Sequence, residues 1–247
     1  MPWYHGPTLM AHLETVPVGD DLESQSFRLP VQWVNRPDLN FRGFSGQIVA
    51  GTVKPGDGIR SLPSGKQSTI ARIVTADGDL PVAVAGQSAT LTLADEIDVS
   101  RGDVIVASTA PPEVADQFEA TLVWMDDEAM LPGRPYLIKI GSKVMTASIT
   151  EPKYKVNVNT LEEQPAKRLE LNEIGVVNLS LDSAIAYEPY ATNKDLGGFI
   201  LIDRMTNRTV GAGMLHFALR RSQNIHWQAI TIDKAAHAAI KGQKGRV

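Results

Sequence analysis

The stretch "FRLPVQW", residues 27–33, decides the fold, because large apolar side chains recur there at every second position. Such alternation is typical of a β-strand that turns one face toward a core. The side chains assigned to the buried face are those of Phe27, Leu29, Val31 and Trp33. Arg28 and Gln32 are assigned to the solvent face. The pattern therefore predicts a half-buried strand with Trp33 in the core.

Short apolar runs continue beyond this strand, and turns that contain glycine separate them. The predicted strands are Gln47–Ala50, Ile59–Leu62, Thr69–Val74, Pro81–Val84, Ala89–Leu93 and Val104–Ala107. Because the connections are short, neighbouring strands are expected to run antiparallel. The first half of the chain is therefore predicted to form an antiparallel barrel or sandwich.

A second all-β unit is predicted after "STAPPEVADQ", residues 108–117, which reads as a boundary because its adjacent prolines cannot donate to a sheet ladder. Trp124 lies in strand alternation and is assigned to the core of this unit. The predicted strands are Phe118–Trp124, Pro135–Ile140, Val144–Thr150, Tyr154–Val158, Gly175–Leu181, Gly198–Ile202 and Val210–Ala218.

Helical signals are confined to the two ends of the chain. The opening helix has Thr8 as its cap and apolar residues on one face. The segment "PVGDD" at 17–21 is predicted to end the helix and to form a linker. The residues of that face are Leu9, Met10, Leu13 and Val16. From Ser222 the chain carries an alanine-rich stretch that passes into Gly, Lys and Arg, which predicts a linker or an exposed end.

Composition indicates a folded protein and argues against several functions. The 247 residues are 43% hydrophobic and 21% charged, which suits one large domain or two ordinary ones. A net charge of −4 argues against binding the phosphate backbone of nucleic acids. No run approaches the roughly 20 apolar residues that cross a bilayer, and a secretory signal is absent from the N-terminus. The absence of cysteine excludes disulfides and fits a cytoplasmic location.

The segment "GDGIRSLPSGKQSTIARI", residues 56–73, places Gly65-Lys66 where a phosphate-binding loop might be sought. A P-loop requires G-x-x-x-x-G-K-[ST], whereas Arg60 stands in place of the first glycine and Gln67 follows the lysine. The β-branched residues that come next favour a strand rather than the required helix. The segment is predicted to be a hairpin with its turn at 63–65 and with Lys66 in solvent.

Other motifs also receive structural interpretations. "TNKDLGG", residues 192–198, has Asp195 in the third rather than the fourth position of the guanine-reading element N-K-x-D, so a loop is predicted. "SRGDV" at 100–104 is predicted to be a turn. The acidic cluster at 126–128 is predicted to be a solvated hairpin end. The five histidines lack the spacing of metal ligands. The residues support no catalytic, cofactor-binding or metal site.

Three long stretches resemble the large subunit of bacterial heterodimeric ATP sulfurylase, a translation-factor-like GTPase family. "MPWYHGPTLMAHLETV" at 1–16 resembles the closing helix of its GTPase domain, and residues 27–57, from "FRLPVQW" to "VKPGD", resemble its second domain. "KRLELNEIGVVNLSLDSAIAYEPYATNKDLGGFILIDRMTNRTVGAGM" at 167–214 resembles its third domain. "RTVGAG" at 208–213 is also similar to the last strand of elongation-factor-Tu-like GTPases.

The resemblance implies a mainly β fold, with two consecutive antiparallel barrels of the elongation-factor-Tu domain 2 and domain 3 type and a short N-terminal helix. The implied organisation is as follows: 1–22, remnant of the last GTPase-domain helix and linker; 23–110, first barrel; 111–222, second barrel; 223–247, C-terminal linker or tail. The end resembles the connector that leads into an adenylylsulfate kinase domain in fused versions. The chain is thus expected to be the C-terminal portion of a longer protein.

The resemblance also implies a function. The large subunit couples GTP hydrolysis to adenylyl transfer from ATP to sulfate by a small catalytic subunit. GTP and Mg²⁺ are expected on the missing GTPase domain, because this chain lacks its motifs. The barrels are expected to dock the small subunit, the GTPase domain and a fused kinase domain, with Trp227 as the interface residue. The alternatives are a translation-factor fragment that binds tRNA or the ribosome, and a generic partner-binding β-module.

Overall fold

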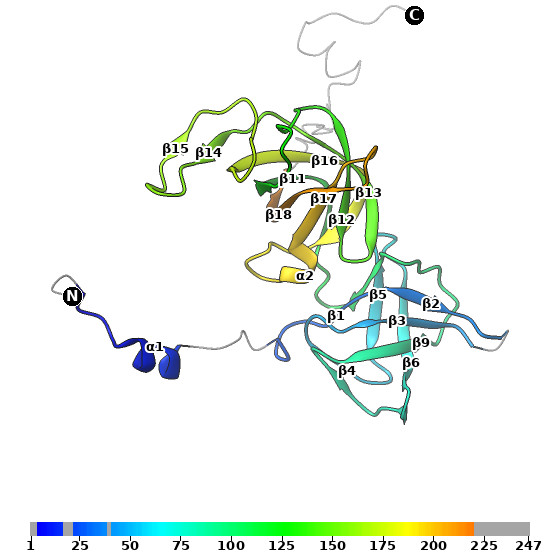
Figure 1. Cartoon of the computed structure of the whole chain (residues 1–247). Helices are drawn as coiled ribbons and strands as arrows, with labels where there is room; N and C mark the ends of the chain where they lie inside the picture. The colour runs from blue at the N-terminus through cyan, green and yellow to red at the C-terminus, as the bar shows by residue number, and fades with distance from the viewer. Residues whose placement is uncertain (1–3, 17–21, 39–40, 220–247) are drawn as a thin grey trace, which may run out of the picture.

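The structure is a computed structural model that describes residues 4–16, 22–38 and 41–219. Two antiparallel β units follow one another along the chain, with one short helix before them (Figure 1). The strands of the first unit are β1 (Arg28–Pro30), β2 (Trp33–Asn35), β3 (Gly43–Gln47), β4 (Thr52–Val53), β5 (Gly58–Leu62), β6 (Gln67–Thr75), β7 (Gly78–Asp79), β8 (Ala83–Val84), β9 (Ser88–Leu93) and β10 (Val104–Ala107).

The first unit curls into a barrel. Its strand order is β1-β10-β5-β6-β9-β3-β2, with β7 beside β6, and β4 pairs separately with β8. An antiparallel bridge between Arg28 and Ala50 brings β1 back to the segment that follows β3, which joins the two sides of the sheet. The core inside is made by alternating residues of these strands, among them Leu29, Phe44, Ile73, Leu91 and Ile105.

The second unit is a closed barrel of six strands. The hydrogen-bonded order runs β11-β18-β17-β12-β13-β16, and β16 pairs again with β11 to complete the circle. The strands are β11 (Glu113–Trp124), β12 (Pro135–Ile140), β13 (Lys143–Ile149), β14 (Tyr154–Val156), β15 (Glu163–Gln164), β16 (Ile174–Tyr187), β17 (Gly198–Ile202) and β18 (Thr209–Ala218). β14 and β15 extend outward from β16.

The predicted strands of both units are confirmed as a set, with local corrections. The strand predicted at Gln47–Ala50 is wrong in position, because β3 spans Gly43–Gln47. A Cβ on Gly46 would collide with the backbone oxygen of Pro30, so this glycine permits close packing of β3 against β1. β11 also begins inside the predicted boundary at 108–117, and β14 ends two residues before the predicted Val158.

The alternation predicted for residues 27–33 is wrong at two side chains. Arg28 is buried, with 5% of its surface exposed, and Trp33 is exposed at 59%. The chain does not continue as one strand, since β1 ends at Pro30 and β2 begins at Trp33, which breaks the period. β1 also has both faces covered, because its core face lies against the first barrel and Arg28 reaches the second.

The N-terminal helix is confirmed as α1 (Leu9–Thr15), and the Thr8 hydroxyl caps it by accepting the Ala11 amide at 3.2 Å. None of its residues is buried in the described structure, and Leu9 is 73% exposed. The predicted linker at 17–21, the tail after Ser222 and Trp227 lie outside the described residues. In the described part, no helix has the length and apolar character needed to cross a membrane.

Candidate functional site

The candidate site is the seam where the two barrels meet, which is built around one buried ion pair. Arg28 Nε donates to Glu188 Oε1 at 2.9 Å, and Arg28 Nη1 donates to the Phe27 carbonyl at 2.9 Å. The two side chains are 6% and 15% exposed. Arg28 is held by β1, and Glu188 follows the last residue of β16. The pair therefore joins segments of the two barrels that lie 160 residues apart in sequence.

Apolar packing lies beside this ion pair, since Arg28 is the cross-strand partner of Val106. A small buried cluster contains Leu62, Val104 and Val106 from the first barrel together with Ala186 and Leu196 from the second. Burial of a continuous apolar cluster across a domain boundary favours a fixed arrangement of the domains. The seam is thus a packed interface and not a flexible linker.

The seam also requires one glycine. Gly102 has φ +93°, and a Cβ there would lie 2.8 Å from the Cβ of Lys143 in the second barrel. The predicted turn at 100–104 is confirmed, since its residues adopt a turn before β10. Its glycine serves both the turn and the approach of the two barrels.

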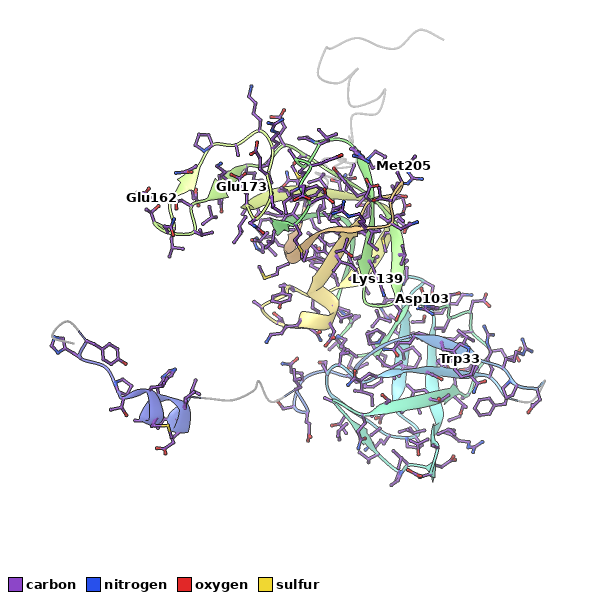
Figure 2. All side chains as sticks on the ribbon, viewed as in Figure 1. Trp33, Asp103, Lys139, Glu162, Glu173 and Met205 are labelled. Carbon is purple, nitrogen blue, oxygen red and sulfur yellow. The ribbon has the colours of Figure 1, made fainter. Side chains whose placement is uncertain are left out.

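A cavity of about 420 Å³ opens along the seam. Arg101 from the first barrel and Lys139 from the second both line it, and Figure 2 labels Lys139 at the junction. Asp195 lies in the same wall, on α2 (Lys194–Gly197). The loop predicted at 192–198 is wrong here, because the Asn193 side chain accepts the amides of Asp195 and Leu196 and so caps a short helix.

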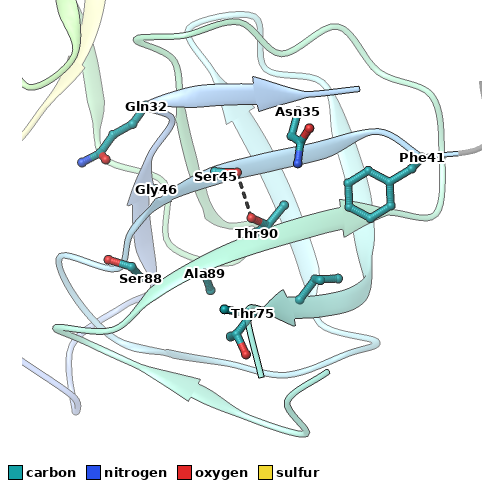
Figure 3. Close-up of a pocket in the computed structure, with 11 residues that line it drawn as sticks. Gln32, Asn35, Phe41, Ser45, Gly46, Thr75, Ser88, Ala89 and Thr90 are labelled. Carbon is teal, nitrogen blue, oxygen red and sulfur yellow. Dashed lines mark hydrogen bonds between the residues drawn. The ribbon is translucent and has the colours of Figure 1, made fainter. Parts of the chain in front are cut away.

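A separate pocket of about 370 Å³ lies on the outside of the first barrel (Figure 3). Ser45 on β3 and Thr90 on the neighbouring strand β9 hydrogen-bond to each other in its wall at 2.8 Å, and Phe41 lies at one end. Its lining residues are Gln32, Asn35, Phe41, Ser45, Gly46, Val74, Thr75, Ala76, Ser88, Ala89 and Thr90. None of these described side chains is ionisable, so the pocket offers hydrogen bonds but no general acid or base.

The segment at 56–73, which was compared with a phosphate-binding loop, is confirmed as a hairpin. β5 pairs with β6, and the Gly65 amide donates to the Ser61 carbonyl at 2.8 Å. Gly65 adopts φ +76°, which suits a turn. Lys66 is half-exposed and pairs with Asp98 at 3.2 Å. The geometry of this segment therefore does not fit a nucleotide phosphate.

At the predicted solvated hairpin end, residues 126–128, Asp127 and Glu128 are exposed as predicted, but Asp126 is buried. Asp126 is 8% exposed, and its Oδ1 accepts the amide of Glu128 at 3.0 Å. Its Oδ2 lies 3.6 Å from Arg208 Nη2. The carboxylate thus organises a turn on the second barrel. Within the described residues, no three acidic or histidine side chains gather as metal ligands.

A polar cluster on the second barrel joins three strands or their flanks. Lys153, just before β14, donates to Glu119 on β11, and His216 Nδ1 on β18 lies 3.3 Å from the same carboxylate. His216 Nε2 lies 2.9 Å from the Thr121 hydroxyl. Burial raises the pKa of Glu119, but the hydrogen bonds from Lys153 and His216 outweigh it and hold the pKa below the ordinary value.

This shift predicts a pH dependence of stability. A carboxylate with a depressed folded-state pKa stabilises the protein above about pH 4.3, and this contribution is lost as the pH falls through the folded pKa. Glu119→Gln should therefore lower the melting temperature by about 2–4 °C near pH 7, and the difference from wild type should shrink below about pH 4. The measurement is thermal unfolding from pH 3 to 7.

Glu170→Gln is the matched control, because Glu170 pairs with Arg168 while both side chains are about 60% exposed. We expect this control to leave the melting temperature unchanged across the pH range. A constant difference between Glu119→Gln and wild type at every pH would contradict the assignment.

Comparison with known proteins divides the chain in the same two parts. Residues 44–106 match the family described as elongation factor Tu domain 2, and residues 117–216 match the family described as GTP-eEF1A C-terminal domain-like. Each match coincides with one of the two barrels. The elongation-factor-Tu-like fold that the resemblance implied is therefore confirmed.

Relatives match along the whole chain. The bifunctional enzyme CysN/CysC of Xylella fastidiosa is 53% identical over all 247 residues, which is 100% of this chain and 40% of the relative. The bifunctional enzyme NodQ of Rhizobium sp. is 49% identical over 100% of this chain and 38% of its own length. Sulfate adenylyltransferase subunit 1 of Pseudoalteromonas atlantica is 48% identical over 90% of this chain and 47% of its own length. The chain thus spans about 40–50% of these relatives.

Solved structures agree on the fold. The crystal structure of sup35 complexed with GDP superposes with a TM-score of 0.75 at 21% identity, over 89% of this chain and 54% of that one. At this identity the likeness establishes the arrangement of the barrels and nothing about chemistry.

The seam residues were missed by sequence reasoning. Arg28 was assigned to solvent because it alternates with the apolar residues of the stretch 27–33, and its partner Glu188 lies 160 residues away. The only local signal was the apolar character of both neighbours of Arg28. Trp227, the predicted interface residue, lies outside the described residues and stays a prediction.

Proposed function

The chain is related along its whole length to the bifunctional enzymes CysN/CysC and NodQ and along 90% of its length to sulfate adenylyltransferase subunit 1, and from this premise we propose that it is the two-barrel portion of the GTP-dependent subunit. In this proposal the barrels form a non-catalytic scaffold that docks the small catalytic subunit, which transfers an adenylyl group from ATP to sulfate. The observation that carries the proposal is the 53% identity to the bifunctional enzyme CysN/CysC. This identity extends over all 247 residues, so it includes both barrels and the seam.

The packed seam supports a scaffolding role. The Arg28–Glu188 pair and the apolar cluster beside it join the two barrels, so a partner that contacts both would find a preformed surface. A nucleotide-bound domain that rotates against such a body could change the contacts offered to the small subunit. The seam is the element that would transmit that change.

The remaining parts of the proposal concern groups outside the described barrels. We propose that GTP and Mg²⁺ bind a GTPase domain in the longer protein, because the residues around Lys66 do not fit a phosphate site. That domain and an adenylylsulfate kinase domain would be the covalently linked neighbours of the barrels. A cytoplasmic location suits a chain of 247 residues without cysteine.

Titration calorimetry with the purified small subunit of sulfate adenylyltransferase tests the docking function. We expect saturable binding with one small subunit per chain, and co-elution of the two in gel filtration. Absence of both heat and co-elution would contradict the proposal. Salt-sensitive binding to tRNA in a parallel titration would instead favour the translation-factor alternative.

A further inference from the structure

The hairpin of β14 and β15 is the part of the second barrel that extends beyond the closed circle of six strands. Figure 1 shows it standing out from the barrel, and Figure 2 shows Glu162 at its far end. We call this element, residues 153–164, the arm. Its tip comprises residues 157–162.

Hydrogen bonds give the tip a defined shape. The Leu161 amide donates to the Asn157 carbonyl at 2.7 Å, and the Asn157 amide donates to the Glu162 carbonyl at 2.9 Å. The Asn157 side-chain oxygen accepts the amides of Asn159 at 2.9 Å and Thr160 at 3.3 Å. A tip held by its own backbone in this way is preorganised for binding.

Leu161 has an energetically unfavourable backbone conformation. Its φ is +60°, in the left-handed region that favours glycine or asparagine and strains a bulky side chain. It is also 77% exposed, and Val158 in the same tip is 59% exposed. Neither the strain nor the exposed apolar surface is offset by packing in the described part of the chain. Strained residues of this kind concentrate where a protein binds something.

The charges of the arm differ between its base and its tip. At the base, Lys153 pairs with Glu119 and Lys155 pairs with Glu173, which neutralises the lysines and fastens the arm to the barrel. At the tip, Glu162 accepts a hydrogen bond from the Thr160 hydroxyl but has no cationic partner among the described residues. The tip therefore presents apolar side chains next to an unneutralised carboxylate.

We propose that the arm tip is a docking element for the small catalytic subunit. Leu161 inserts into an apolar pocket of that subunit, and lysine or arginine residues border the pocket. The inference rests on the proposed function, since it names the surface by which the barrels bind that partner. The negative charge of the tip favours a partner surface with basic residues around the pocket. Because the tip backbone is preformed, Leu161 is positioned without an entropic cost of ordering the loop.

Leu161→Asn is the decisive variant, because asparagine tolerates the left-handed conformation and removes the apolar side chain. We expect the dissociation constant for the purified small subunit to rise at least about tenfold, as for a binding hot spot, while the melting temperature stays equal or rises. Glu162→Lys should also weaken binding, and added salt should reduce that effect.

Met205→Asn is the matched control. Met205 is 83% exposed on the turn between β17 and β18 of the same barrel, away from the arm. This variant should bind the small subunit within about twofold of wild type.

The outcomes separate this inference from the proposed function. If wild type does not bind the small subunit, the proposed function fails. If wild type binds, and Leu161→Asn and Glu162→Lys bind equally well, the barrels dock by another surface and the arm proposal is wrong. Equal weakening by Met205→Asn would also overturn it, because the loss of binding would then not be specific to the arm.

Discussion

Replacing Arg28 with methionine is expected to lower the free energy of unfolding by about 3–5 kcal/mol, which is the usual effect of removing one partner from a buried ion pair. Glu188 would be left without its cation, with only 15% of its side chain exposed to solvent. Methionine fills much of the volume of the arginine stem, so the loss reports the unpaired carboxylate more than a cavity.

Urea unfolding measured by circular dichroism tests this expectation. The exposed pair Arg168–Glu170 supplies the control, since Arg168→Ala should change stability by less than about 0.5 kcal/mol. The double variant Arg28→Met with Glu188→Leu should recover much of the loss, because no charge then remains buried. A double variant as unstable as the sum of the two single variants would contradict direct coupling across the seam.

A second transition in the Arg28→Met unfolding curve would show that the seam makes the two barrels unfold together. Wild type is expected to unfold in one step, since the barrels share buried surface. Once the pair is broken, each barrel keeps its own core and can unfold separately.

The fold was predictable because local signals and tertiary structure agree in most strands. The strands predicted at Val104–Ala107, Pro135–Ile140 and Gly198–Ile202 coincide with β10, β12 and β17. Each is a short run of apolar residues bounded by turns, so alternation and turn chemistry give the same answer. The strand pattern predicted two β units, whereas the elongation-factor-Tu type of their barrels came from the resemblance of longer motifs and is confirmed by the family matches.

The candidate site was not predictable, because it depends on contacts between distant segments. Arg28 is buried only because β1 lies against a second barrel whose Glu188 meets it, and single-strand alternation cannot encode that partner. Asp126 was likewise predicted to be solvent-exposed, but its carboxylate accepts the Glu128 amide and lies 3.6 Å from Arg208 Nη2. Burial of charge is decided by tertiary pairing, which the spacing of residues in one strand does not contain.

Trp124→Ala is expected to destabilise the protein by about 3–5 kcal/mol, whereas Trp33→Ala should cost less than about 0.5 kcal/mol. Both tryptophans were assigned to a core by alternation, but Trp124 is 2% exposed and Trp33 is 59% exposed. Trp124 packs edge-on against Tyr136 with ring centroids 5.6 Å apart, and its indole N–H donates to the Glu128 carbonyl at 2.6 Å.

Trp124→Phe separates packing from hydrogen bonding in that site. Phenylalanine keeps an aromatic ring against Tyr136 but leaves the Glu128 carbonyl without its donor, so we expect a loss of about 1–2 kcal/mol, well short of the alanine variant. Urea unfolding of the three variants gives the order Trp33→Ala, Trp124→Phe, Trp124→Ala from least to most destabilised. If Trp33→Ala were as destabilising as Trp124→Ala, the break between β1 and β2 would be wrong, because only a continuous strand carries Trp33 to the core side.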